Sequence, residues 1–96
     1  MTSKEKKKAK QRDSYYRRKY GISLDHYNLM LIKQEFCCAL CRRNRKEFKN
    51  NLAVEHNHKS GKVRSLCCFY CNKYRIGRNN LESAKALYEY MVKYDG

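Results

Sequence analysis

Two pairs of cysteines, each separated by two residues, constrain the fold of this chain more than any other feature. Cys38 and Cys41 form the first pair, and Cys68 and Cys71 form the second. Two intervening residues allow both thiolates of a pair to face one ion at about 2.3 Å, and four thiolates complete a tetrahedral zinc site with no open position for chemistry. A chain of 96 residues has a thin core and gains stability from such a metal. The pattern predicts a small α+β zinc-stabilised domain.

Disulfides, or buried thiols without a metal, are the alternative interpretation of these cysteines. The first residues, "MTSKEKKKAKQR", lack the apolar segment of a secretory signal, and no window approaches the roughly 18 apolar residues of a membrane span. We therefore expect a cytoplasmic protein, in which thiols stay reduced and cysteine pairs bind metal. Cys37 and Cys67 are separated from Cys41 and Cys71 by three residues rather than two, a spacing that suits a shared metal less well. We expect these two cysteines to pack as small apolar side chains.

The large positive charge points to a polyanionic partner. Lys and Arg number 23 against 9 acidic residues, which gives a formal net charge of +14. Nucleic acid is the first candidate, because basic side chains displace the counterions condensed on phosphates. A membrane surface is disfavoured, since the basic segments carry Tyr rather than the Leu, Phe and Trp of an interfacial helix. Solubility alone usually needs a net charge of only about 2 to 8.

Helical segments are expected on both sides of the cysteine pairs. Residues 1–20 suit a basic helix or a disordered basic arm, and we assign residues 21–96 to the zinc-stapled domain. Ser23 is a good N-cap for a helix over residues 24–35. Asn80 is the expected N-cap of a last helix. This helix has an apolar stripe, which we interpret as a core or dimer contact. The stripe consists of Leu81, Ala84, Leu87, Tyr88, Met91 and Tyr94.

The segment "LAVEHNHKSGKVRSLCCFYCN", residues 52–72, combines a hairpin signal with chemically active side chains. Two short apolar runs flank "NHKSG", which has a glycine in the expected loop. Phosphodiester hydrolysis needs a general base for water and a divalent cation on the phosphate. His56 offers a base with a pKa near neutral pH, while Glu55 and Asn72 offer the oxygen ligands that Mg²⁺ prefers.

Strand geometry sets a condition on this site. In a regular strand His56 and His58 share one face and Glu55 points to the other, so Glu55 and His56 reach one phosphate only if the strand ends or bends there. Taken singly, each residue has an ordinary alternative: His58 can bond to the loop backbone, and Asn72 can cap the following helix. Their combination with two cysteine pairs favours a reaction centre whose halves are held together by zinc.

The same residues carry a family resemblance. The first cysteine pair followed by "VEHNHKSGKVRSLCCFYCN" resembles the phage endonuclease VII family, within the His-Me finger (HNH) endonucleases, whose pattern is similar to V-D-H-D-H and then T-G-x-V-R-G-L-L-C-x-x-C-N. The chain matches that pattern at Val54, His56, His58, Gly61, Val63, Arg64, Leu66, Cys68, Cys71 and Asn72. The segment "YGISLDHYNLMLIKQEFCCALC" also resembles the region before the first cysteine pair in many members. The resemblance covers roughly residues 20–78.

The resemblance implies a ββα-metal (His-Me) finger flanked by N-terminal and C-terminal helices, with structural Zn²⁺ on the four paired cysteines. By motif position His56 is the general base, Glu55 and Asn72 hold a catalytic Mg²⁺ or Mn²⁺, and His58 assists at the phosphate. Where the family usually has Asp, Glu55 keeps the charge and lengthens the arm by one methylene, and the next acid of the pattern is Asn57. The implied function is that of an HNH-type DNA endonuclease. One branch of the family acts on branched DNA, which makes branched DNA a possible substrate. If the chain is phage-encoded, the implied location is the host cytoplasm.

Two other functions compete with a nuclease. One is a non-catalytic, zinc-stabilised nucleic-acid-binding module, in which Tyr residues stack on unpaired bases. The other is an accessory subunit of a phage or recombination complex that docks, or forms a homodimer, through its last helix. For the nuclease, we expect the DNA backbone to be tracked without sequence reading by Arg42, Arg43, Lys59, Lys62 and Arg64.

Overall fold

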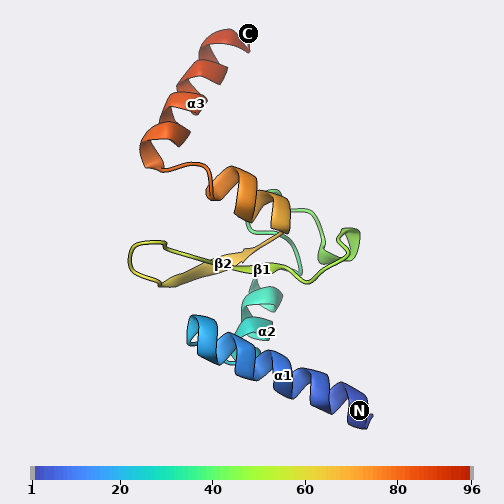
Figure 1. The fold of residues 1–96 in the computed structure, drawn as a ribbon. Coiled ribbons are helices and arrows are strands. Elements are labelled where there is room, and N and C mark those ends of the chain that lie inside the picture. The colour runs from blue at the N-terminus through green and yellow to red at the C-terminus, as the bar shows by residue number, and fades with distance from the viewer. Residues whose placement is uncertain (1, 96) are drawn as a thin grey trace.

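The computed structural model describes residues 2–95 as a two-stranded hairpin with helices on both sides, which confirms a small α+β domain. The elements follow the order α1 (Ser3–Tyr20), α2 (Leu24–Lys33), η1 (Arg45–Glu47), β1 (Ala53–His56), β2 (Val63–Cys67), η2 (Cys71–Ile76) and α3 (Leu81–Tyr94). Figure 1 shows the hairpin in the middle, α1 and α2 on one side of it, and the gold-to-orange turns of η2 on the other. The molecule measures 56 × 29 × 20 Å, with a radius of gyration of 16.0 Å against about 13 Å for a compact chain of this length.

The basic N-terminal segment is a helix rather than a disordered arm. Thr2 caps α1 by accepting the N–H of Glu5 at 3.2 Å. Gly21 ends the helix in the left-handed region, at φ 72°, and its N–H donates to the Arg17 carbonyl. Tyr16 is the one residue of α1 that is buried among the described residues. The helix therefore docks through its C-terminal half, and its first turns project from the molecule (Figure 1).

Two contacts hold α1 against α2. The rings of Tyr16 and Tyr27 stack at 4.8 Å between centroids with 6° between their planes, and the Arg12 guanidinium lies about 5.5 Å from each ring centre. The Asp13 carboxylate accepts the Leu24 N–H at 2.8 Å, which ties the first turn of α2 to α1. The α1–α2 pair is thus held by stacked aromatic rings and by a carboxylate that caps the second helix.

Helix α2 ends at Lys33, two residues before the expected end. Glu35 and Phe36 adopt φ values of 55° and 62°, a conformation that side chains other than glycine rarely take. These two residues turn the chain back toward the hairpin. The Gln34 side chain fixes the turn, because its Nε2 donates to the carbonyls of Cys37 and Leu66 and its Oε1 accepts the Leu66 N–H at 2.9 Å.

The hairpin is antiparallel and carries a bulge. Val54 pairs with Leu66 and Glu55 with Ser65, but His56 pairs with Val63, so Arg64 has no partner across the sheet. Strand β1 ends at His56, beside this irregularity, so the chain leaves the regular strand where Glu55 and His56 meet.

The small core lies where the hairpin meets α2. It includes Leu52, Val54 and Leu66, each at most 3% exposed, and the four buried cysteines Cys38, Cys67, Cys68 and Cys71. The Tyr27 hydroxyl donates to the Leu52 carbonyl at 2.6 Å and links α2 to the chain entering β1.

A wide helical turn carries the chain out of the hairpin. η2 is a π-helix, and the N–H of Gly77 closes it by donating to the Asn72 carbonyl at 2.9 Å. Glycine is needed there, since a Cβ at position 77 would lie 2.5 Å from the Lys73 carbonyl oxygen.

Helix α3 corrects one expectation. Asn80 caps it as expected, but no residue of α3 is buried, and Leu87, Tyr88 and Met91 are each more than half exposed. The core half of the core-or-dimer interpretation is therefore wrong, because the linker after η2 directs α3 away from the hairpin (Figure 1). The dimer contact stays a prediction. None of the helices within residues 2–95 has the length and apolar content needed to span a membrane.

The Tyr27 hydrogen bond gives a stability prediction. Replacing Tyr27 by Phe keeps the ring stack and leaves the buried Leu52 carbonyl without its donor, so we expect the free energy of unfolding to fall by about 1–3 kcal/mol. Burial raises the pKa of Tyr27 to about 12, so this contribution is present below pH ~10 and is lost as the pH rises toward 12. Denaturant unfolding of the variant, with Tyr90→Phe on exposed α3 as the matched control, measures the difference. Equal stability of the two variants would contradict it.

Candidate metal centre and active site

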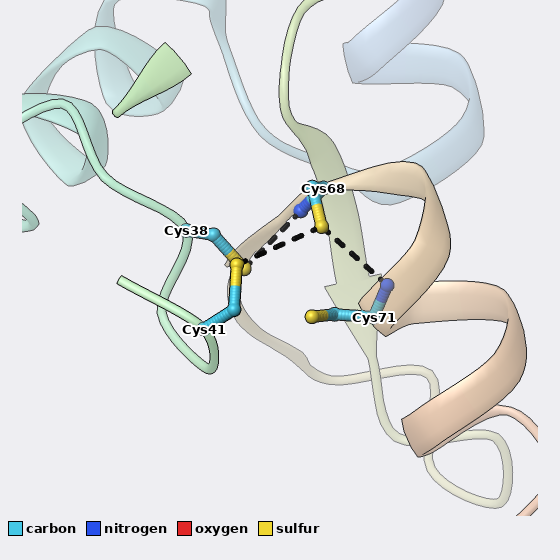
Figure 2. Close-up of side chains that lie close together, drawn as sticks. All are labelled: Cys38, Cys41, Cys68 and Cys71. Carbon is cyan, nitrogen blue, oxygen red and sulfur yellow. Dashed lines mark hydrogen bonds between the residues drawn. The ribbon is translucent and has the colours of Figure 1, made fainter. Parts of the chain in front are cut away.

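The four paired cysteines meet at one point of the fold. Cys38 and Cys41 lie on the loop after α2, while Cys68 and Cys71 lie between the end of β2 and the start of η2. Their sulfur atoms all lie within 4.8 Å of one another, and Figure 2 shows the four side chains converging. A tetrahedral zinc–thiolate site places its sulfurs roughly 3.8 Å apart. The residues therefore fit, and could hold, a metal ion such as zinc.

Backbone amides point at the sulfurs of this cluster. The Cys68 N–H donates to Cys38 Sγ at 3.4 Å, and the Cys71 N–H donates to Cys68 Sγ at 3.5 Å. Burial opposes ionisation of Cys38, but the N–H groups of Cys41, Cys68 and Leu40 outweigh it and lower the pKa of Cys38 to about 6. Burial instead raises the pKa of Cys71. Cys38 is thus ready as a thiolate at neutral pH, whereas metal binding would have to displace a proton from Cys71.

The other two cysteines stay outside the cluster. Cys67 is 1% exposed, and burial raises the pKa of its thiol to about 11. Cys37 is half-buried and donates to the Glu35 carbonyl at 3.3 Å. All six cysteines of the described chain are free thiols, so the disulfide alternative has no support among residues 2–95.

Glu55, expected to be a metal ligand, is buried and paired with Arg64. The Glu55 side chain is 3% exposed. Arg64 Nε donates to one carboxylate oxygen at 2.8 Å, and Arg64 Nη2 donates to the other oxygen. Arg64 Nη2 also lies 3.4 Å from the His56 carbonyl. Arg64 is the residue of the bulge that has no register partner, and its guanidinium lies against Glu55. Sequence reasoning missed this pair.

The two histidines lie side by side at the end of β1. Their ring centroids are 4.8 Å apart, and the His56 ring also lies 5.7 Å from the ring of Tyr20 in α1. His56 is half-buried and His58 is exposed. The intervening Asn57 builds the loop, since its Oδ1 accepts the N–H groups of Lys59 and Ser60. The sequence pattern had given no role to this residue beyond its departure from the family's acid.

Asn72 follows the last cysteine of the cluster and is the second residue of η2. Its N–H donates to the Cys68 carbonyl at 2.9 Å, and its side chain is not hydrogen-bonded to any other described residue.

Carboxylate and amide oxygens, such as those of Glu55 and Asn72, have the chemistry that a hard divalent cation requires. In the structure, however, Arg64 engages both oxygens of Glu55, so a cation could bind Glu55 only after that pair opens. Within residues 2–95 the paired cysteines are the one group of three or more metal-binding side chains brought close together.

The basic residues expected at DNA differ in their surroundings. Arg43 pairs with Glu47 at 3.4 Å, and Arg42 with Glu35 at 3.9 Å, both on the surface where such pairs contribute little to stability. Lys59 and Lys62 lie on the exposed hairpin loop. A cleft of about 810 Å³ adjoins this loop and separates it from α3, with His58, Lys59 and Arg64 on one wall and the apolar side of α3 on the other.

Comparisons with known proteins point to one family. The family model described as recombination endonuclease VII matches residues 13–94. The Gene 59 protein of Mycobacterium phage L5 is 40% identical over 75 residues, which cover 76% of this chain and 45% of that protein. The Gene 59 protein of Mycobacterium phage D29 is 37% identical over 76 residues, which cover 77% and 46%. The chain therefore spans less than half the length of these two relatives. No solved structure gives a significant match.

The cysteine cluster predicts which thiols a metal needs. Replacing Cys41 by Ser should abolish binding of one Zn²⁺ per chain and unfold the hairpin region, because metal-binding energy is folding energy in a domain this small. Cys37→Ser, outside the cluster, should keep the metal. Zinc content by mass spectrometry and far-ultraviolet circular dichroism before and after chelation provide the measurement. A Cys41→Ser protein that retained stoichiometric zinc would contradict the assignment.

Proposed function

The chain belongs to the recombination endonuclease VII family, and from that membership we propose that it is a DNA endonuclease that hydrolyses phosphodiester bonds with a divalent cation. The observation that supports this most is the pair of neighbouring His56 and His58 rings at the end of β1, 4.8 Å apart between centroids. In this proposal the hairpin and η2 form the ββα-metal finger of His-Me (HNH) nucleases, and Zn²⁺ on the four paired cysteines is structural. Because both curated relatives are phage proteins, we place the reaction in the cytoplasm of an infected host.

His56 is the general base in this proposal. A neutral imidazole accepts a proton from water near pH 7, and the half-buried position of His56 against the Tyr20 ring limits the orientations that its ring can take. His58, exposed and 4.8 Å from His56 between ring centroids, assists at the phosphate.

Glu55 and Asn72 hold the catalytic Mg²⁺ or Mn²⁺ in this proposal. When bound, such a cation stabilises the charge that develops on the scissile phosphate. Arg64 makes this role conditional, because its guanidinium neutralises Glu55 in the DNA-free protein. A phosphate is an equally suitable bidentate partner for a guanidinium. We therefore propose that Arg64 exchanges Glu55 for a DNA phosphate, which frees the carboxylate when substrate is present.

The remaining DNA contacts are electrostatic. Arg42, Arg43, Lys59 and Lys62 would follow the phosphate backbone together with Arg64, and the net charge of +14 strengthens the attraction at low salt. Branched DNA is the proposed substrate form, since cutting two strands of a junction suits a pair of active sites.

A homodimer through α3 would supply that pair. Leu87, Tyr88 and Met91 expose a continuous apolar side that borders the cleft next to His58. Exposed apolar surface of this kind marks interaction sites in monomeric folds. A second copy packing its own α3 into the cleft would cover the stripe.

A non-catalytic nucleic-acid-binding module is the second candidate function. The Arg64–Glu55 pair favours it, because a carboxylate held on both oxygens is not available to a metal. If the pair persists on DNA, the chain binds without cutting.

The general-base assignment predicts a large rate effect. His56→Ala should lower divalent-dependent cleavage of plasmid or four-way-junction DNA by roughly 10²–10⁴-fold, without loss of zinc or of fold. His26→Ala, on the exposed face of α2, is the matched control and should cut at the wild-type rate. Undiminished cleavage by His56→Ala would remove the mechanism.

The Arg64 exchange predicts a gain in metal binding. In zinc-loaded protein without DNA, Arg64→Gln should bind Mn²⁺ several-fold more tightly than wild type, because Glu55 loses its cationic partner. The same variant should bind DNA more weakly. Calorimetric or paramagnetic titration with Mn²⁺ measures the first effect, with Arg43→Gln as the control. Unchanged Mn²⁺ binding would favour the non-catalytic module.

The α3 interface predicts a change in mass. Wild-type protein should elute as a dimer in size-exclusion chromatography with light scattering, and Leu87→Glu should be monomeric. Lys93→Glu, on the opposite side of α3, should leave the dimer intact. A monomeric wild type at all concentrations tested would exclude this interface.

A further inference from the structure

Two exposed aromatic side chains and one half-buried one form a group at the start of the helical turn after β2. Phe69 and Tyr70 are 64% and 57% exposed, although they directly follow the buried Cys68. The Tyr74 ring joins them, at 5.3 Å from Tyr70 and 6.4 Å from Phe69 between centroids. We name Phe69, Tyr70 and Tyr74 the η2 aromatic cluster.

Basic side chains surround this cluster. Lys73 Nζ lies 5.3 Å from the Phe69 ring centre, and the guanidinium of Arg75 lies 5.5 Å from that of Tyr70. The Arg78 guanidinium is closer still, at 4.7 Å from the Tyr74 ring centre. No acidic residue occurs between positions 69 and 80. The surface therefore combines exposed ring faces with uncompensated positive charge.

Folding does not account for these rings. The inward side of the turn is Cys71, which is 1% exposed and belongs to the metal-binding cluster, while Phe69 and Tyr70 face away from the core. Helices α1 and α2 lie on the other side of the hairpin and do not cover this surface (Figure 1). Large aromatic side chains left in water are expected to have a ligand with apolar, flat surfaces of its own.

We propose that the η2 aromatic cluster stacks unpaired DNA bases, so that the preferred substrate carries a single-stranded segment beside the site that is cut. Aromatic faces bind bases of any sequence, and neighbouring cations hold the backbone. Duplex DNA presents phosphates and hides the faces of its bases, so it would use the cations and not the rings. The inference rests on the proposed function for the identity of the ligand as DNA, but it does not require cleavage.

The test compares single-stranded and duplex DNA. Zinc-loaded protein without added Mg²⁺ or Mn²⁺ is titrated into fluorescent 20-nucleotide single strands, the matching duplex and a forked duplex. Tyr70→Leu and Tyr74→Leu, which keep an apolar side chain, should each weaken binding to the single strand and the fork by roughly tenfold and to the duplex by less than twofold. Tyr90→Leu, on α3 and 63% exposed, is the control and should change neither. Arg78→Gln should weaken all three ligands alike.

The outcomes separate this inference from the proposed function. Equal weakening on single-stranded and duplex DNA would overturn stacking and leave only backbone contacts. No weakening on any DNA would overturn it as well, and would assign the surface to a protein partner. Selective loss of single-strand binding would support the cluster even if wild-type protein cut no DNA. Cleavage that depends on His56 without any single-strand preference would leave the nuclease standing and remove this inference.

Discussion

The convergence of the two cysteine pairs is the contact on which the rest of the structure depends. It joins the loop after α2 to the junction between β2 and η2, segments about thirty residues apart that are also linked by the hydrogen bonds of Gln34 to Leu66. The apolar core beside it is small, with Leu52, Val54 and Leu66 from the hairpin region and Tyr16, Ile22 and Tyr27 from the N-terminal helices. A metal at the four thiolates would therefore set both the position of Asn72, the residue after Cys71, and the register of the hairpin that carries His56. The chemistry of the hairpin depends on this join, since general bases act only within hydrogen-bonding reach of their targets.

The β-bulge after Glu55 is the second determinant of the site. The extra residue of the bulge is Arg64 on β2, which is left without a partner across the sheet. Arg64 then neutralises the buried carboxylate, which would otherwise be costly to bury. Arg64 also lines the cleft together with His58, where a phosphate could reach it. In this account Arg64 either neutralises the buried Glu55 or binds an anionic ligand such as a phosphate.

Much of this could be predicted from local patterns, and the family resemblance is confirmed. Cysteine spacing led to the metal-binding cluster, Ser23 and Asn80 marked helix starts, and Gly61 marked the hairpin loop, since each depends on a few neighbouring residues. The sequence did not predict the Glu55–Arg64 pair or the hydrogen bonds between the Gln34 side chain and Leu66. The first occurs at a bulge and the second beside a left-handed turn, and neither feature follows the regular spacing of a helix or a strand. The stripe on α3 was left open between core and dimer contact for a similar reason, because amphipathic spacing identifies an apolar side but not whether the same chain covers it.

Hydrogen exchange of the backbone amides, measured on zinc-loaded protein and again after chelation, tests most directly whether the cysteine cluster holds the site together. If it does, removing the metal will abolish protection throughout β1, β2 and η2 at once, because the hairpin and the helix lose their common anchor. Protection that disappears only in the two cysteine loops, with the Val54–Leu66 pair unchanged, would contradict this account. It would show that the small apolar core positions His56 and Asn72 without the metal.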